Sequence, residues 1–154
     1  MRVYLIQHGD ALSKDADPER ALSGAGCADI ERLAVFLEKT DLAVTRVLQS
    51  GKTRARQTAE ILATRLAPMV AIEAASGIDP LDDPEPLARQ LEASEESIAI
   101  VGHLPFLGKL VSRLVAGNEA ADIVSFQPGS VVCLERSEDK WTIAWMLRPE
   151  LLKQ

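Results

Sequence analysis

Histidine and cysteine are scarce in this sequence, and their scarcity restricts the chemistry that it can carry. The 154 residues include two histidines and two cysteines. Cys27 and Cys133 lie far apart and form no Cys-x-x-Cys pair, which excludes a zinc knuckle and argues against a framework of disulfides. A metal bound by both histidines would need a third ligand, for which Asp10 is the candidate, but no H-E-x-x-H or H-x-x-E-H motif is present. We therefore expect no metal.

The sequence also lacks an excess of positive charge and any long hydrophobic run. The sequence has 17 lysines and arginines and 23 acidic residues, so its net charge is −6. This charge argues against a general binder of nucleic acid or anionic membranes. A small local basic site remains possible. The N-terminal apolar run, Val3 to Ile6, is too short for a signal peptide or a membrane span. We expect a soluble, cytoplasmic protein with a single domain over residues 1–154.

Short apolar runs alternate with amphipathic stretches along the chain, and this alternation is typical of an α/β fold. Strands are predicted at residues 3–6, 45–49, 70–72, 98–101, 130–134 and 141–146. Helices are predicted from about 23 to 39, and through 55–66, 84–91 and 104–115. On the last strand, Trp141 and Trp145 are expected to share one face and to serve packing. The expected architecture is a three-layer α/β sandwich with a mostly parallel central sheet and an antiparallel hairpin near the C-terminus.

Both histidines directly follow predicted strands. His8 follows the first strand and His103 the fourth, while Ser50 to Arg54 follow the second. All three segments should emerge at the carboxyl edge of the parallel sheet, where ligands bind in such folds. Histidine can act there as a nucleophile, a proton carrier, a metal ligand or an anion binder. An arginine beside helix N-termini points to a bound anion, most naturally phosphate.

Three motifs, in the order found here, resemble those of the histidine phosphatase superfamily with its phosphoglycerate-mutase-like fold. The family pattern is an R-H-G box, an S-x-x-x-R-A-x-Q-T segment and a late G-H followed by L-P. The sequence has Gln7-His8-Gly9 for the first, residues 50–58 (SGKTRARQT) for the second and residues 102–105 (GHLP) for the third. The short length, the Asp10-Ala11 continuation and the segment from Arg20 to Gly26 are most similar to the SixA-type phosphohistidine phosphatases.

The resemblance implies a role for each matching residue. His8 would attack phosphorus and become a transient phosphohistidine, His103 would donate to the phosphoryl group, and Arg54 would hold its oxygens. The expected substrate-binding residues are Gln7, Gly9, Arg20 and Ser50. The cations and helix ends neutralise the phosphate, so no cofactor is expected. The implied substrate is a phosphohistidine on a protein, with a small phosphorylated metabolite as the other possibility.

Two positions depart from the family pattern. Gln7 stands where the family has arginine, which removes a positive charge and keeps an NH₂ donor, so phosphate binding should weaken. This leaves open a non-catalytic module that binds phosphoproteins. The family's glutamate after the third strand is also missing. Asp79 is the candidate acid in that region, but a solvated loop carboxylate is the favoured interpretation of it. The missing acid favours cleavage of P–N over alkyl P–O bonds, because a departing imidazole can take its proton from solvent.

Overall fold

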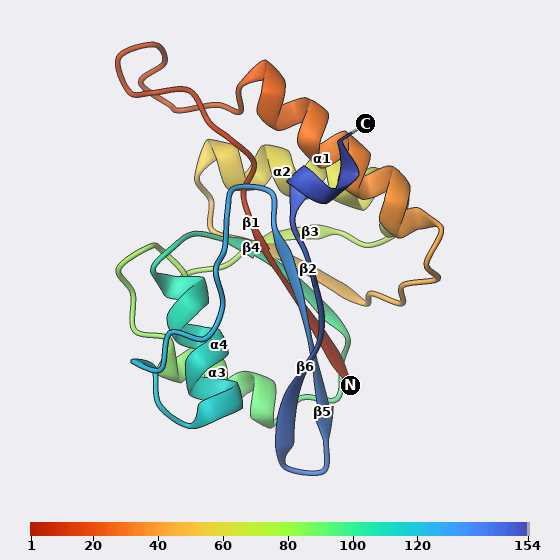
Figure 1. Ribbon diagram of the computed structural model, residues 1–154, viewed down its shortest axis with the longest axis vertical. Coiled ribbons are helices and arrows are strands. Elements are labelled where there is room, and N and C mark those ends of the chain that lie inside the picture. Colours follow the sequence, from red (N-terminus) through yellow and green to blue (C-terminus); the bar gives the residue numbers. More distant parts are fainter. Residues whose placement is uncertain (154) are drawn as a thin grey trace.

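The computed structural model describes residues 1–153, in which strands and helices alternate as the sequence predicts (Figure 1). The strands are β1 (Arg2–Gln7), β2 (Arg46–Gln49), β3 (Ile72–Ala74), β4 (Ile98–Gly102), β5 (Val131–Ser137) and β6 (Lys140–Leu147). The α-helices are α1 (Gly24–Glu38), α2 (Thr53–Leu66), α3 (Glu85–Glu92) and α4 (Phe106–Ala116), and a 3₁₀ turn, η1, spans Pro149–Leu152.

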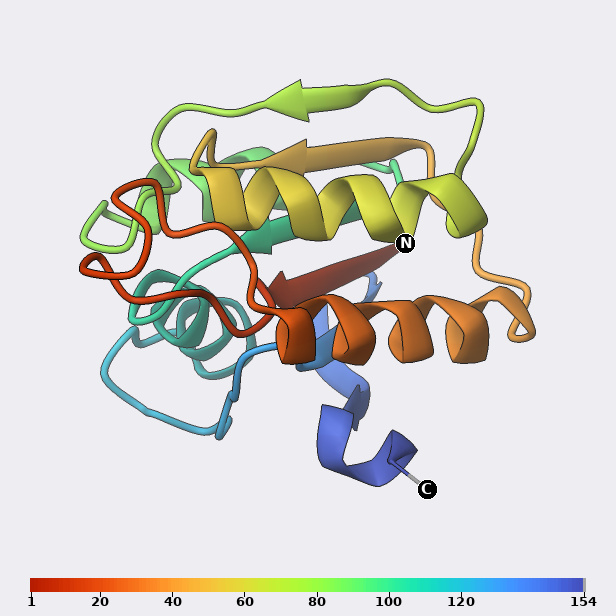
Figure 2. The ribbon, with the colours of Figure 1, turned by 90° about the horizontal axis from the view of Figure 1, so that it is seen from above.

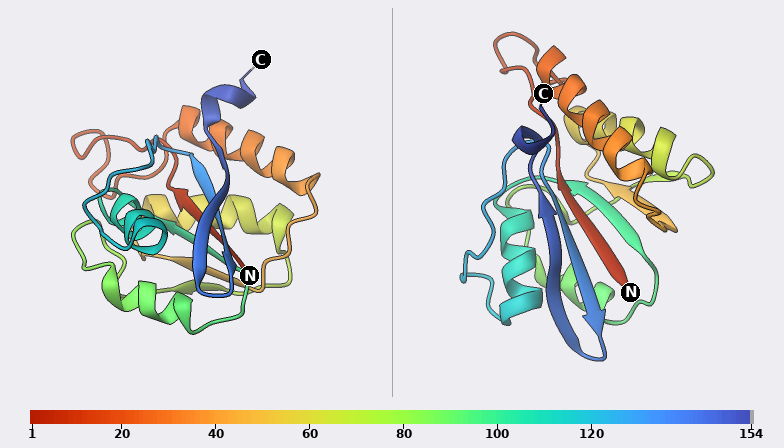
Figure 3. Two further views of the ribbon diagram at one scale, coloured as in Figure 1. Left: turned by 60° about the horizontal axis from the view of Figure 1, so that its bottom comes forward. Right: turned by 45° about the vertical axis from the view of Figure 1, so that its right-hand side comes forward.

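The strands form one sheet in the order β3-β2-β4-β1-β5-β6. The first four are parallel to one another, whereas β5 runs antiparallel to β1 and β6 antiparallel to β5. The β5–β6 hairpin extends beyond the amino end of β1, and η1 then returns to the side of α1 (Figure 3). The expected α/β fold with a C-terminal antiparallel hairpin is confirmed.

Both faces of the sheet are covered, which explains the continuous apolar character of β1. Val3 and Leu5 belong to the core shared with α3 and α4, while Tyr4 and Ile6 belong to the core shared with α1 and α2. Figure 2 shows α1 and α2 side by side along one face of the sheet. A strand buried on both faces carries apolar residues at successive positions, so the run predicted a central strand correctly.

Helix α1 begins at the predicted cap. The Ser23 hydroxyl accepts a hydrogen bond from the Gly26 amide at 3.0 Å, which satisfies one of the free donors of the first turn. Lys39 caps the other end, so the predicted range of 23–39 is confirmed. This cap also holds the loop after β1 against the helix, because the Ser23 amide donates to the Asp10 carbonyl at 2.9 Å.

Three local predictions were wrong. Strand β3 begins at Ile72 rather than Val70, because the Val70 amide is used in a turn that closes on Ala67. The fourth helix, predicted to begin at Leu104, begins at Phe106, and Leu104 is 38 % exposed.

Trp141 and Trp145 also lie on opposite faces rather than the same one. Trp141 is buried in the core under α3 and α4, whereas Trp145 contacts Tyr4 on the α1 side with ring centroids 6.2 Å apart. The pairing of β5 with β6 shifts between Cys133 and Leu134, and one added residue in a strand reverses the alternation of its side chains.

Across residues 1–153, no helix has both the length and the apolar character needed to cross a bilayer.

Candidate active site

The loops after three neighbouring strands bring the two histidines together. Strand β4 lies between β1 and β2, all three are parallel, and their carboxyl ends therefore meet at one edge of the sheet. The His8 amide donates to the Gly102 carbonyl at 3.1 Å, which joins the end of β1 to the end of β4. The rings of His8 and His103 then lie with centroids 5.0 Å apart and planes inclined at 50°.

The protonation of the His8 ring follows from its neighbour. Its Nδ1 donates to the Gly9 carbonyl at 2.7 Å, and because a carbonyl only accepts, the proton of the neutral ring resides on Nδ1. Burial lowers the pKa of His8, with further lowering by the charges of Arg54 and Arg20, and the Gly9 carbonyl opposes this shift. His8 is therefore neutral at pH 7, with the lone pair on Nε2.

The backbone around His8 is fixed from two helices. The Gly9 amide donates to Thr58 Oγ1 at 3.0 Å, and that hydroxyl donates to the Arg54 carbonyl at 2.8 Å, so α2 anchors the loop. A Cβ at position 9 would lie 2.9 Å from Cγ1 of Ile30 in α1, which explains the glycine by its contact with a helix. A Cβ at Gly26 would lie 2.1 Å from the Asp10 carbonyl oxygen. The anchoring by Thr58 was missed at the sequence level, although Thr58 closes the second motif.

His103 is buried and held by Ser50. The side chain is 2 % exposed, its Nε2 lies 2.6 Å from Ser50 Oγ, and its Nδ1 is buried without a partner among the described residues. Burial lowers the pKa of His103 to about 3, and the nearby His8 ring and Arg54 guanidinium add to this shift. His103 is therefore also neutral at pH 7 in the free protein.

Two arginines near the histidines differ from all the others in the chain. Of eleven arginines, nine form an ion pair with a carboxylate. Over residues 1–153, the two without such a pair are Arg20 and Arg54. Burial and the charge of Arg20 lower the pKa of Arg54, which the Asp79 carboxylate partly opposes. Arg20 has a left-handed backbone (φ 51°), and its Nε donates to the Leu12 carbonyl at 3.1 Å.

An open, positively charged hollow connects these arginines. Its volume is about 510 Å³, and its lining residues are Ser13, Lys14, Arg20, Lys52 and Arg54. The lining contains four cations and no carboxylate, in a chain whose net charge is −6. Two cations without carboxylate partners beside two neutral histidines form a site for an anion.

The remaining predicted site residues to be placed are Gln7 and Asp79. Gln7 is 8 % exposed, and its Oε1 is buried without a hydrogen-bond partner within residues 1–153. Asp79 is exposed in the loop between β3 and α3, where its amide donates to the Asp82 carboxylate at 2.8 Å. Its carboxylate acts on Arg54 through charge but forms no described hydrogen bond with His8 or His103. In the described part of the chain, no three His, Cys, Asp or Glu side chains are grouped to hold a metal ion.

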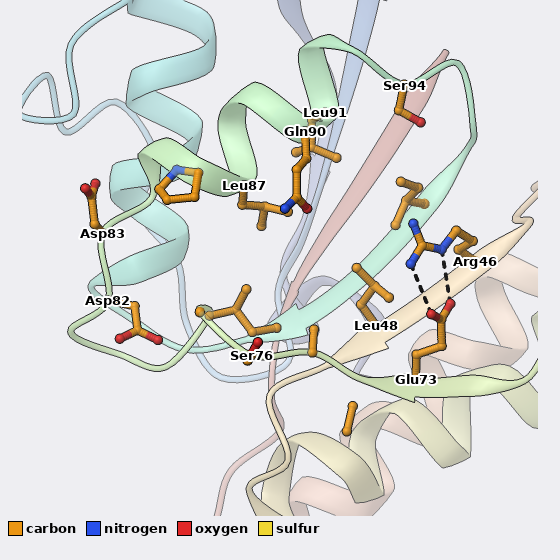
Figure 4. Close-up of a pocket in the computed structure, with 16 residues that line it drawn as sticks. Arg46, Leu48, Glu73, Ser76, Asp82, Asp83, Leu87, Gln90, Leu91 and Ser94 are labelled. Atoms are coloured by element: carbon orange, nitrogen blue, oxygen red, sulfur yellow. Dashed lines mark hydrogen bonds and ion pairs between the residues drawn. The ribbon is translucent and has the colours of Figure 1, made fainter.

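A second cavity of about 500 Å³ lies between α3 and the strands β2 and β3 (Figure 4). Neither histidine lines it. Its walls include apolar side chains such as Leu48 and Leu87, the acidic residues Asp82 and Asp83, and the pair in which Arg46 lies 3.0 Å from Glu73. Carboxylates at both ends of this cavity disfavour a phosphoryl anion, so we assign the anion site to the basic hollow.

Comparison with known proteins agrees with this geometry. No family model matches the chain. The chain is 30 % identical over 158 aligned residues to phosphohistidine phosphatase SixA of Escherichia coli K12, with 99 % of this chain and 97 % of that protein covered. A solved structure of the protein histidine phosphatase SixA complexed with tungstate is 28 % identical, has a TM-score of 0.88, and covers 99 % of this chain and 100 % of its own. SixA from Agrobacterium tumefaciens, 23 % identical with a TM-score of 0.77 and coverage of 96 % and 97 %, shares the fold.

The similarity extends over nearly the whole of both chains, and the three motifs occur within it in the family order. The chain belongs to the SixA family of the histidine phosphatase superfamily.

Proposed function

We propose that this protein hydrolyses phosphohistidine carried on a protein, through a covalent phosphohistidine intermediate on His8. The observation that carries the proposal is the 2.7 Å hydrogen bond from His8 Nδ1 to the Gly9 carbonyl, which leaves Nε2 of the neutral ring unprotonated and nucleophilic. Two relatives support it: the one from Escherichia coli is a phosphohistidine phosphatase, and the solved SixA structure is complexed with tungstate, a tetrahedral oxyanion.

In the first step, the Nε2 lone pair of His8 attacks phosphorus and the P–N bond to the substrate's imidazole breaks. The departing imidazole takes a proton from solvent. Arg54 and Arg20 hold the equatorial oxygens of the phosphoryl group, because neither guanidinium has a described carboxylate partner to compete with it. The start of α2, which carries Arg54, presents backbone amides to the same oxygens.

In the second step, water attacks phosphorus, the bond to Nε2 breaks, and the water proton passes to solvent as inorganic phosphate leaves. His103, whose ring centroid lies 5.0 Å from that of His8, donates to a phosphoryl oxygen from Nε2, in a hydrogen bond shared with Ser50 Oγ, because its Nδ1 is buried. Ser50 holds the His103 ring in position. A bound phosphoryl dianion favours the charged imidazole, so His103 gains a proton more readily in the complex than in the free protein.

A phosphoramidate is the substrate class that best fits these groups. No carboxylate among residues 1–153 is hydrogen-bonded to His8 or His103 in a position to protonate an alkyl oxygen. Asp79, whose charge reaches Arg54, is the acid that we propose for slower turnover of a small phosphomonoester. The two cysteines are free thiols, which fits our further proposal of a cytoplasmic location.

The proposal is tested by incubating the protein with p-nitrophenyl phosphate and with a phosphohistidine-bearing carrier protein, with His8→Ala as the control. We expect release of phosphate from the carrier and an acid-labile phosphate trapped on the wild type, and neither with His8→Ala. A circular dichroism spectrum of His8→Ala that matches the wild type excludes misfolding as the cause. Binding of the carrier without turnover would overturn the enzyme proposal and favour a phosphoprotein-binding module with Gln7 in place of arginine.

A further inference from the structure

We propose that the loop of residues 11–22, here termed the arm, uses Lys14 to bind an acidic segment of the protein that carries the phosphohistidine. This inference rests on the proposed function and adds to it a charge preference for the surroundings of the phosphohistidine. It concerns recognition of the partner, not the chemistry at phosphorus.

The arm is an ordered element that stands out from the body of the protein (Figure 1). Its two sides pair at Ala11 and Leu22, and the Leu12 amide donates to the Ala21 carbonyl at 2.8 Å. At its base, the Leu22 amide donates to Gln57 Oε1 of α2 at 2.8 Å. The arm therefore has a defined position beside the N-terminus of α2, and Lys14 is presented on one wall of the basic hollow.

The acidic residues of the arm and its base are mostly engaged by other groups. Asp17 accepts hydrogen bonds from the amides of Glu19 at 3.1 Å and Ala21 at 2.9 Å, and Asp10 accepts one from the Ser23 hydroxyl at 2.6 Å. Asp15 and Glu19 are exposed, and neither forms a described ion pair with Lys14. Lys14 is therefore available to carboxylates of another molecule.

The hollow holds more positive charge than a phosphoryl group needs. A phosphoryl group carries at most two negative charges, and Arg20 and Arg54 balance them in the proposed reaction. Lys14 and Lys52 remain, and the lining supplies no carboxylate for them. Because the hollow is open to solvent, the surplus charge faces whatever surrounds the phosphohistidine. Carboxylates on a protein partner complement this charge, whereas a small phosphorylated metabolite without a further anionic group does not.

Two synthetic peptides test the inference. Each contains one phosphohistidine, flanked on both sides by glutamates in one peptide and by glutamines in the other. At about 0.01 M salt, where the Debye length is about 30 Å, we expect the wild type to have a kcat/KM about threefold higher for the glutamate peptide. At about 1 M salt, where the Debye length is about 3 Å, the preference should disappear.

The variants are Lys14→Gln and Lys14→Glu, with Lys140→Glu as a control of equal charge change in the exposed hairpin turn at the other end of the molecule (Figure 1). We expect both Lys14 variants to lose the preference through KM, and Lys140→Glu to keep it. Lys140→Glu should turn over p-nitrophenyl phosphate like the wild type. For the Lys14 variants, which alter a wall of the basic hollow, the ratio of kcat/KM between the glutamate and the glutamine peptide tests the inference. Three outcomes would overturn the inference and leave the proposed phosphatase activity intact. They are a wild type without preference for the glutamate peptide, a Lys14→Glu variant that keeps the preference, and a Lys140→Glu variant that loses it. Absence of turnover of both peptides would instead overturn the proposed function, and the inference with it.

Discussion

The Ser50 hydroxyl lies 2.6 Å from Nε2 of His103 and so joins the loop after β2 to the loop after β4. The other ring nitrogen of His103 has no described partner, and the ring is almost fully buried. Among the described residues, the hydrogen bond with Ser50 therefore sets the rotation of the His103 imidazole beside His8. We infer that Ser50 acts on the reaction through His103, as a positioning residue.

Replacing Ser50 tests this relationship. Ser50→Ala should lower kcat about fivefold and leave KM nearly unchanged, because a hydrogen bond of about 1 kcal/mol that orients His103 is lost. Ser50→Thr restores the hydroxyl and should recover most of kcat, which a merely structural role for the small side chain would not produce. Steady-state kinetics with a phosphohistidine peptide provide the measurement. An unchanged kcat in Ser50→Ala would show that His103 needs no partner at this edge.

The contact of α1 with the loop after β1 requires a glycine at position 26. A Cβ there would lie 2.1 Å from the Asp10 carbonyl oxygen, a backbone atom that cannot turn aside as a side chain can. Gly26→Ala should therefore lower the free energy of unfolding by about 3 kcal/mol. Gly24→Ala, two residues earlier in the same helix, meets nothing within 4 Å and should be neutral or slightly stabilising. Urea unfolding followed by circular dichroism distinguishes the two, and equal stabilities would contradict the close approach.

The main features of the fold and the position of the site could be predicted from the sequence because they depend on local patterns. The apolar run before His8 predicts a strand buried on both faces, and Ser23 predicts the start of α1. Once the strands are parallel, their carboxyl ends meet at one edge, so His8 and His103 are expected at that edge. That they are neighbours follows from the pairing of β1 with β4 in the structure. The alternation of strands and helices alone thus leads to the convergence at one edge of the sheet.

Contacts between segments far apart in the chain could not be predicted in this way. Ser50 and His103 are separated by 53 residues, and their hydrogen bond depends on the exact height at which two loops leave the sheet. The faces of Trp141 and Trp145 depend on the added residue in the pairing of β5 with β6, which no local signal marks. The sequence also gives no sign that Gln7 is buried. Its burial depends on the segment 129–130, which is hydrogen-bonded to the Gln7 backbone.

We predict that position 7 limits how tightly the site holds an anion. Gln7→Arg should lower the dissociation constant for tungstate about tenfold, because a charge-assisted hydrogen bond is stronger than a neutral one by about 1–2 kcal/mol. Gln7→Met, which is similar in size and carries no amide, should not tighten binding. Isothermal titration calorimetry with each variant measures the effect, and thermal unfolding checks that the buried charge is tolerated. A well-folded Gln7→Arg protein with wild-type affinity would show that this position does not limit anion binding.

His103 should make the stability of the protein depend on pH. Its pKa is about 3 in the folded protein against an ordinary value of 6.5, since burial and the charges of His8, Arg54, Lys52 and Arg20 disfavour the imidazolium. As the pH falls below 6.5, the unfolded chain takes up a proton at this residue and the folded protein does not. The stability present above pH 6.5 is therefore lost progressively between pH 6.5 and 3.

At about pH 4.5, the loss from His103 should be on the order of 2 kcal/mol. Urea unfolding of the wild type and of His103→Gln at about pH 7.5 and pH 4.5 separates this contribution from that of the carboxylates, which titrate in both proteins. His103→Gln should lose less stability on acidification than the wild type by about that amount. An equal loss in the two proteins would mean that His103 has a nearly ordinary pKa and that burial does not keep it neutral.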